Sequence, residues 1–158
     1  MGKTLVAYFS ATGTTARAAK DLAGAIGADT FEIVPERPYT REDLNWNDKS
    51  SRSTREMNDE SSRPRIDGLI EDMGAYDTVF VGFPVWWYVE PRIIDTFLEA
   101  YDFAGKLIVP FATSGGSGLG RASQRMQAIA KGSTVAEGRV LNGRQRAETL
   151  RAWANGLR

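Results

Sequence analysis

The chain has 158 residues, enough for one domain with a sizeable core. It lacks cysteine and histidine, which excludes disulfides, thiol chemistry, iron–sulfur clusters, the usual zinc sites and histidine-based catalytic triads. Its 20 basic residues balance its 20 acidic ones, so charge gives no case for binding nucleic acid or an anionic membrane. The apolar runs are too short to span a bilayer, and we expect no signal peptide and a cytoplasmic location.

Segments typical of strands and helices alternate along the chain. Apolar runs predict five strands, at residues 3–9, 30–34, 78–83, 106–112 and 134–141, the last interrupted near Glu137-Gly138. Apolar residues at helical spacing predict helices at 13–26, 91–101, 119–130 and 143–157. This alternation implies a doubly wound α/β sheet, in which ligands bind outside the carboxyl ends of the strands. The loops after the first, third and fourth strands are therefore the candidate site.

Residues 35–66 break the alternation with a polar, charged segment that is long for a connection within one domain. We expect most of it to be a solvated excursion without chemistry. Some helix is expected within 43–59, and Tyr39 and Trp46 are expected to pin the segment to the body. The prediction is thus a single domain over 1–158 that contains a polar insert.

The first loop, Ser10-Ala11-Thr12-Gly13-Thr14-Thr15, joins a buried strand to an amphipathic helix. The helix N-terminus offers unpaired N–H groups, the hydroxyls add donors, and Gly13 lets the backbone turn closely around an anion. These features indicate a phosphate cradle, although hydroxyl residues also serve as ordinary helix caps. The loop contains no Lys or Arg, which suits a permanently bound cofactor better than a phosphoryl group in transfer. Neither the Walker pattern nor G-x-G-x-x-G occurs after this strand.

The second loop carries three consecutive aromatic residues within Pro84-Val85-Trp86-Trp87-Tyr88. Consecutive loop residues cannot all point into one core, and large exposed aromatic surfaces are costly. At least one ring is therefore expected to lie against a flat aromatic ligand. The alternative is that Trp86 or Trp87 only covers the core.

The third loop, Thr113-Ser114-Gly115-Gly116-Ser117-Gly118, is rich in glycine. Without β-carbons its backbone can approach a ligand closely, and its N–H groups can donate to the polar edge of a ring. A flexible loop at the start of a helix would have the same composition. Together the three loops indicate a planar heteroaromatic ring joined to one phosphate, and FMN fits this description.

These segments resemble the flavodoxin family, and the resemblance covers essentially the whole chain. The first loop matches the family pattern S/T-x-T-G-x-T, while FPVWWYVEPR, FATSGGSGLG and the insert ending in Arg63-Pro64 look like one flavodoxin-like subgroup. The resemblance implies a three-layer, flavodoxin-like α/β fold. Its five-stranded parallel sheet would have the order 2-1-3-4-5, for which flavodoxin is the standard example, with FMN at the carboxyl edge.

The resemblance also implies which residues hold FMN. The phosphate would be bound by Ser10, Thr12, Gly13, Thr14 and Thr15. One side of the ring would be lined by Pro84, Val85, Trp86, Trp87 and Tyr88, and the other side and the pyrimidine edge by Thr113, Ser114, Gly115, Gly116 and Gly118. No catalytic residue and no metal ligand is expected. The chain departs from the acidic, well-studied flavodoxins in being neutral, and it lacks their flanking Tyr after the fourth strand, so stacking is expected from one side.

The leading interpretation is an electron carrier that shuttles electrons between redox partner proteins. It would act as a monomer or weak dimer, without nucleic acid or membrane insertion, and FMN would perform the redox chemistry. The main alternative is an FMN-dependent quinone or nitro reductase that uses NAD(P)H and needs room over the ring for nicotinamide and substrate. A third reading, an interaction domain without cofactor, is disfavoured by the intact Ser/Thr loop.

Overall fold

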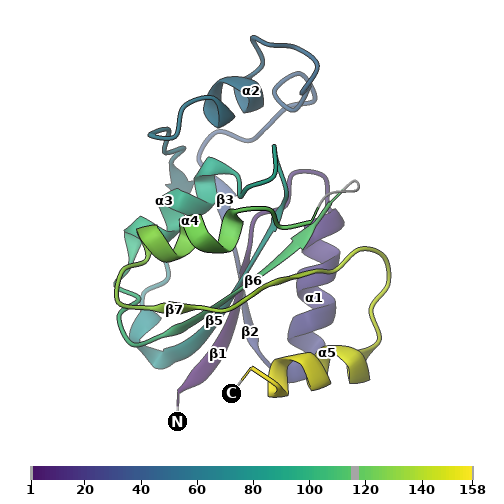
Figure 1. The fold of residues 1–158 in the computed structure, drawn as a ribbon, viewed down its shortest axis with the longest axis vertical. Helices are drawn as coiled ribbons and strands as arrows, with labels where there is room; N and C mark the ends of the chain where they lie inside the picture. The colour runs from purple at the N-terminus through teal and green to yellow at the C-terminus, as the bar shows by residue number, and fades with distance from the viewer. Residues whose placement is uncertain (1, 115–117, 158) are drawn as a thin grey trace.

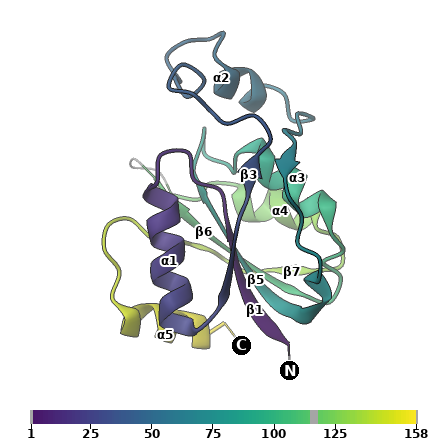
Figure 2. The same ribbon diagram turned by 180° about the vertical axis from the view of Figure 1, so that it is seen from behind.

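The computed structural model describes residues 2–114 and 118–157 and shows a parallel sheet with helices on both faces (Figures 1 and 2). The strands of this sheet are β1 (Lys3–Tyr8), β2 (Asp29–Glu32), β5 (Tyr76–Pro84), β6 (Leu107–Thr113), β7 (Thr134–Val135) and β8 (Arg139–Val140). Their order is β2-β1-β5-β6-β7, with β8 also paired to β6, and all pairings are parallel. Because β5 and β6 are the third and fourth predicted strands and β7 and β8 together form the fifth, the predicted fold and strand order are confirmed.

Two helices cover each face of the sheet. Helix α1 (Thr14–Ile26) packs with α5 (Ala147–Asn155) on one face, and α3 (Arg92–Ala100) packs with α4 (Ala122–Ile129) on the other. Both α4 and α5 begin later than predicted, because Gly120 and Gly143 turn the chain with φ values of 58° and 71° shortly before them. Among the helices described, none is long and apolar enough to cross a membrane.

The predicted break in the fifth strand lies beside a proline of the neighbouring strand. β7 pairs with residues 107–108 of β6, and β8 pairs with residues 111–112. Pro110, between these two pairings, has no N–H to donate to a ladder. Gly138 lies against Pro110 so closely that a β-carbon there would come within 2.4 Å of the proline carbonyl oxygen. The two halves of the strand are thus separated by a local loss of pairing.

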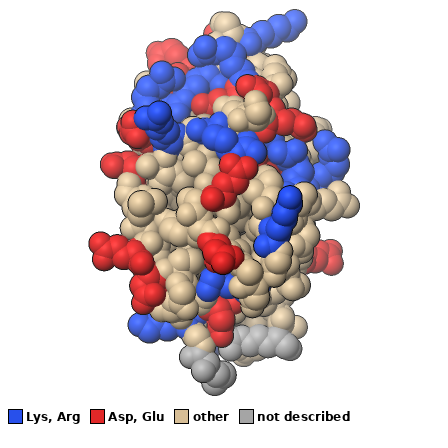
Figure 3. Space-filling view, turned by 90° about the vertical axis from the view of Figure 1, so that its left-hand side faces the viewer, with Lys and Arg blue, Asp and Glu red and all other residues tan. Residues whose placement is uncertain are grey.

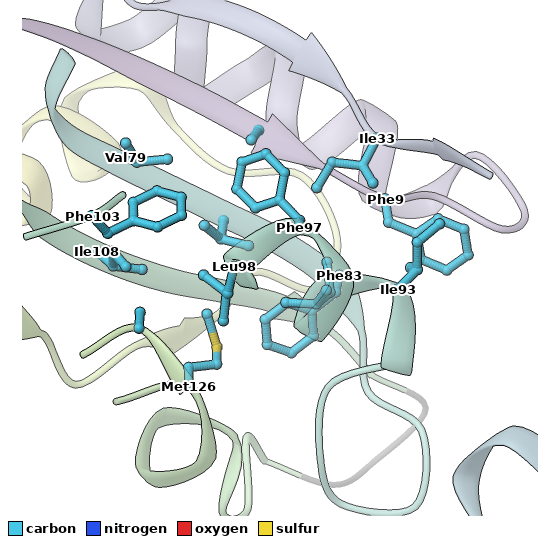
Figure 4. Close-up of a cluster of buried hydrophobic side chains, with 14 of the residues drawn as sticks. Phe9, Ile33, Val79, Phe83, Ile93, Phe97, Leu98, Phe103, Ile108 and Met126 are labelled. Carbon is cyan, nitrogen blue, oxygen red and sulfur yellow. The ribbon is translucent and has the colours of Figure 1, made fainter. Parts of the chain in front are cut away.

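The sheet divides the apolar core into two layers. The layer beneath α3 and α4 is formed by side chains that include Phe9, Ile33, Val79, Phe83, Ile93, Phe97, Leu98, Phe103, Ile108 and Met126 (Figure 4). The layer beneath α1 and α5 contains Leu22, Phe80 and Leu150. Full burial of each large side chain contributes about 1.5–3 kcal/mol. This packing fixes the strand ends from which the candidate loops leave.

The polar insert forms a lobe beyond the carboxyl end of the sheet (Figures 1 and 2). At its base β3 (Val34–Pro35) pairs antiparallel with β4 (Ile66–Asp67). Its helix is α2 (Arg52–Met57), which falls within the predicted 43–59. After the lobe, a short 3-10 helix, η1 (Met73–Ala75), leads into β5.

The two aromatic residues expected to pin the insert behave differently. The Tyr39 ring lies 5.6 Å from the ring of Phe9 and 5.4 Å from that of Trp86, which confirms its role. The prediction was wrong for Trp46, which is 68% exposed. A short polar turn at 45–48, held by bonds between its own residues, keeps this side chain away from the core.

Candidate functional site

The loops after β1, β5 and β6 meet at one edge of the sheet because parallel strands end on the same side. Together with the insert they surround a cavity of about 410 Å³, a size typical of small-molecule sites. The cavity is lined by Ala11, Thr12, Thr14, Leu44, Trp46, Ser53, Pro84, Val85, Trp86, Trp87, Thr113, Ser114 and Asn142. None of these side chains is charged, so the cavity presents hydroxyls, amides and aromatic surfaces.

The first loop is shaped for hydrogen-bond donation. Gly13 has φ 96°, in the left-handed region, and its N–H donates to Ser10 Oγ at 3.0 Å. Helix α1 begins at the next residue, and the first N–H groups of a helix have no acceptor within it. The exposed hydroxyls of Thr12 and Thr14 lie 3.5 Å apart at this end of the helix. The loop thus offers neutral donors and the positive end of a helix dipole.

Thr15 takes a different position from the other hydroxyl residues of this loop. It is buried, and its Oγ1 lies 2.8 Å from Oγ1 of Thr113 at the end of β6. The two hydroxyls therefore join the first loop to the third loop. Thr15 acts as a link between loops, whereas Thr12 and Thr14 line the cavity.

The second loop contains a tight turn with unusual backbone angles. Trp86 and Val89 exchange two backbone hydrogen bonds of 3.0 and 3.1 Å, and between them Trp87 and Tyr88 have φ values of 50° and 68°. Such angles cost bulky residues roughly 1–2 kcal/mol each. The turn leaves Trp87 43% exposed at the cavity and Tyr88 68% exposed outside it.

Trp86 combines the two roles that the sequence left open. It lines the cavity, and it also packs on the core, with its ring edge-on to Phe9 at 5.8 Å. Trp87 does not pack on this core among the described residues, and it is the more exposed wall of the cavity. The aromatic loop is thus anchored by one tryptophan and presents the other.

The start of α4 supports this turn from outside. The Arg121 N–H donates to the Tyr88 carbonyl at 3.2 Å. Gly120 has φ 58°, and a β-carbon there would come within 2.0 Å of the Tyr88 carbonyl oxygen. This glycine is therefore required by a backbone contact within the protein. Gly118 is exposed and does not line the cavity, and Gly115 and Gly116 lie outside the described residues.

The model of the family described as Flavodoxin matches residues 3–157. This chain belongs to the flavodoxin family. The comparison with curated proteins gave no match.

Solved structures similar to this flavodoxin-family chain include two from Bacteroides. A protein of Bacteroides eggerthii, provisionally named a flavoprotein, is 50% identical with a TM-score of 0.94 over 99% of this chain and 98% of that one. A protein of Bacteroides uniformis with the same provisional name is 51% identical, with a TM-score of 0.91 over 98% of each chain. A flavoprotein of Lactobacillus acidophilus in complex with FMN is 22% identical, covers 89% of this chain and 93% of that one, and has a TM-score of 0.71, a likeness of fold.

Asn142 is a site residue of this flavodoxin-family chain that sequence reasoning missed. Its side chain accepts from the Ser114 N–H at 2.9 Å and donates to the Ser114 carbonyl at 2.8 Å. The Asn142 amide thereby bonds both backbone groups of Ser114, the first residue after β6, as a neighbouring strand would. The signal available in the sequence was an Asn-Gly pair directly after the broken fifth strand.

The insert contributes a second set of missed residues. Leu44, Trp46 and Ser53 line the cavity, so this part of the insert lies at the candidate site rather than in solvent away from it. Behind them, the Tyr39 hydroxyl donates to Glu56, and the Arg52 guanidinium lies 3.8 Å from the centre of the Tyr39 ring. Burial, helped by the bond to Glu56, raises the pKa of Tyr39 far above its ordinary value. Tyr39 is therefore a neutral donor at any physiological pH.

Proposed function

We propose that this flavodoxin-family chain binds FMN in the 410 Å³ cavity and carries electrons between redox partner proteins. The observation that supports this most is one uncharged cavity with a donor-rich loop at a helix N-terminus and a tryptophan wall. A phosphate joined to an apolar, flat ring needs this combination. The FMN complex of the Lactobacillus flavoprotein, which shares the fold, agrees with the proposal.

The phosphate end of FMN fits the first loop. The hydroxyls of Thr12 and Thr14 and the first N–H groups of α1 would donate to the phosphate oxygens. Ser10 would act through Gly13, whose N–H it accepts. Without a cation in the lining, the phosphate charge would be met by neutral donors and the helix dipole.

The ring end of FMN fits the second and third loops. Trp87 and Trp86 offer flat apolar surface for the ring, and Ser114, whose backbone is held by Asn142, also lines the cavity. Trp46 of the insert stands at the same cavity. Pro84 and Val85 complete the aromatic wall, and roles for Gly115 and Gly116 remain predictions from the sequence alone.

The lining favours a carrier over an enzyme with its own substrate. Bound FMN would supply the electron chemistry, whereas the chain would orient the ring and exclude water from it. None of the described lining residues has a carboxyl, amine, imidazole or thiol group, so the lining supplies no general acid or base to activate its hydroxyls. The reductase alternative is supported by a second hollow of about 600 Å³, which shares Thr12, Leu44 and Trp46 with the cavity and offers room for another molecule.

The carrier and the reductase can be distinguished by adding NADPH to the FMN-loaded protein under anaerobic conditions. A carrier should keep its flavin absorbance with NADPH alone and lose it when a flavodoxin reductase is added. Rapid bleaching of the flavin by NADPH alone, with turnover of a quinone, would show that the protein is a reductase and not a carrier.

A further inference from the structure

Two carboxyl groups are buried where the aromatic loop enters α3, away from the cavity lining. Glu90 and Asp95 are both 0% exposed, and Arg92 beside them is 3% exposed. Burial of an ionised carboxylate is costly unless it is paired and hydrogen-bonded. The proposed binding of FMN makes no use of these groups, so their burial needs its own explanation.

A single guanidinium contacts both carboxyl groups. Arg125 of α4 donates from Nε to Glu90 Oε2 at 3.3 Å and from Nη2 to Asp95 Oδ2 at 3.2 Å. This arrangement places the two carboxyl groups side by side. Their remaining oxygens, Glu90 Oε1 and Asp95 Oδ1, are buried and receive no hydrogen bond from the described residues.

Among the described residues, neither of the other nearby cations forms a hydrogen bond with Glu90 or Asp95. Arg92 donates to the carbonyls of Glu56 at 3.2 Å and Met57 at 2.8 Å. Its Nη1 lies 3.9 Å from Asp95, beyond hydrogen-bond range, and is buried without a hydrogen-bond partner among the described residues. Arg63 of the insert also stands 3.9 Å from Asp95. Its Nε and Nη2 form a double hydrogen bond with Glu99 at 3.0 and 3.1 Å.

Arg125 itself is shared with a third carboxylate. Its Nη1 lies 3.2 Å from Glu60 of the insert, which is largely exposed. Basic and acidic side chains crowd together at this end of the molecule (Figure 3). Within the described residues, the buried pair thus has one directly bonded cation, which a third acid also contacts.

We infer that Glu90 and Asp95, which bond to the same guanidinium, share one proton, and that this pair positions the aromatic loop against α3 and α4. A proton on one carboxyl group makes that group a donor, so that two neighbouring acidic groups that could otherwise only accept can bond to each other. Burial, together with the neighbouring Asp95, raises the pKa of Glu90 to about 9, which agrees with this inference.

The positioning role follows from where Glu90 lies in the chain. It directly follows Val89, which closes the turn that presents Trp87. Through Arg125 and Arg92 the pair is also connected to the insert, which supplies Trp46 to the cavity. Loss of the shared proton would set two negative charges side by side at the base of the aromatic loop.

The sign of the pH effect is set by the raised pKa. Between the ordinary carboxyl value of 4.5 and about 9, the folded protein holds a proton that the unfolded chain releases. The resulting stability is complete below the lower value and is lost as the pH rises through about 9. The charged groups that face the pair are Arg125 from α4, Arg92 from α3, and Arg63 and Glu60 from the insert.

The test compares the full-length protein with Glu90→Gln, which mimics a protonated carboxyl group because its amide donates to Asp95. The wild-type-minus-variant infrared spectrum at neutral pH should contain the carbonyl band of a protonated carboxyl group. The unfolding free energy should fall with pH more steeply in wild type, by a slope equal to about one proton. Glu90→Gln should keep the near-ultraviolet circular dichroism of its tryptophans, whereas Glu90→Ala should alter it.

Glu148→Gln, an exposed acid on α5, is the matched control and should change neither the band nor the slope. A wild-type spectrum without the band, together with equal slopes, would overturn the inference and leave two ionised carboxylates neutralised by Arg92 and Arg125. Failure of both Glu90→Gln and Asp95→Asn to fold would also overturn it, since each mimics the proposed neutral partner. These readouts need no flavin, so the result is independent of the proposed function.

Discussion

At the scale of single residues, the hydroxyls of the first loop have two different roles, one at the cavity and one in the packing between loops. Thr12 and Thr14 are exposed at the helix N-terminus and line the cavity, whereas Thr15 is buried against Thr113. The shared sequence pattern does not distinguish these roles, because all of these side chains carry the same hydroxyl. Substitutions separate them through ligand affinity and stability.

Replacing Thr12 and Thr14 together with Val should weaken FMN binding at least tenfold. Each hydrogen bond to a charged group is worth about 1.5–3 kcal/mol, and the two hydroxyls are the donors at the helix end. Calorimetric titration of the apoprotein measures this loss. Riboflavin, which lacks the phosphate, should be affected little, and Thr149→Val, on exposed α5, should have no effect. Equal losses of affinity for FMN and riboflavin would show that this loop does not bind the phosphate.

Thr15→Val should instead reduce stability, by about 1–3 kcal/mol, because the buried Thr113 hydroxyl loses its partner. Adding Thr113→Val should recover much of the loss, since no unpaired hydroxyl remains. Urea unfolding of the two single variants and the double variant measures the coupling. Additive effects would show that the 2.8 Å contact contributes nothing.

At the scale of elements, the start of α4 and the turn at Trp87 and Tyr88 form one unit. The turn holds two bulky residues at positive φ, and the α4 side supports it with the Arg121 hydrogen bond and with Gly120. Strain of this kind persists only where neighbouring structure enforces it. The placement of Trp87 at the cavity therefore depends on a helix that does not line it.

Gly120→Ala should destabilise the protein by about 2–4 kcal/mol and move the tryptophan signals. The added methyl group meets the Tyr88 carbonyl at 2.0 Å in addition to the cost of positive φ. Gly105→Ala is the matched control, because Gly105 has φ 78° with open space around it, and should cost only about 1–2 kcal/mol. Urea unfolding followed by tryptophan fluorescence compares the two, and equal costs would show that the Tyr88 contact carries no energy.

At the scale of the whole molecule, the doubly wound α/β sheet could be predicted from local patterns, whereas its strand order was implied by the resemblance to the flavodoxin family. Even the break in the fifth strand was visible, because Gly138 interrupts the apolar run, although its cause lies in Pro110 of another strand. The contributions of Asn142 and Trp46 to the cavity could not be predicted, since each depends on a contact between segments far apart in the chain. The same limit applies to the pairing of Glu90 with Arg125.

The insert makes a testable contribution to the site as a whole. Trp46→Ala should weaken FMN binding about 3- to 10-fold through lost ring contact, yet change stability by less than about 0.5 kcal/mol because the side chain is 68% exposed. Leu69→Ala is the control, since Leu69 is 69% exposed and does not line the cavity. If Trp46→Ala leaves the affinity for FMN unchanged, Trp46 does not contact the ligand and the insert has a purely structural role.

The central claim is that FMN occupies the cavity between the three loops and the insert. Titration of the apoprotein with FMN, followed by tryptophan fluorescence, tests it most directly because Trp46, Trp86 and Trp87 all line this cavity. The account predicts one-to-one binding with strong quenching, and at least tenfold weaker binding of riboflavin, since the phosphate bonds would be missing. Binding without quenching, or equal affinity for FMN and riboflavin, would contradict it.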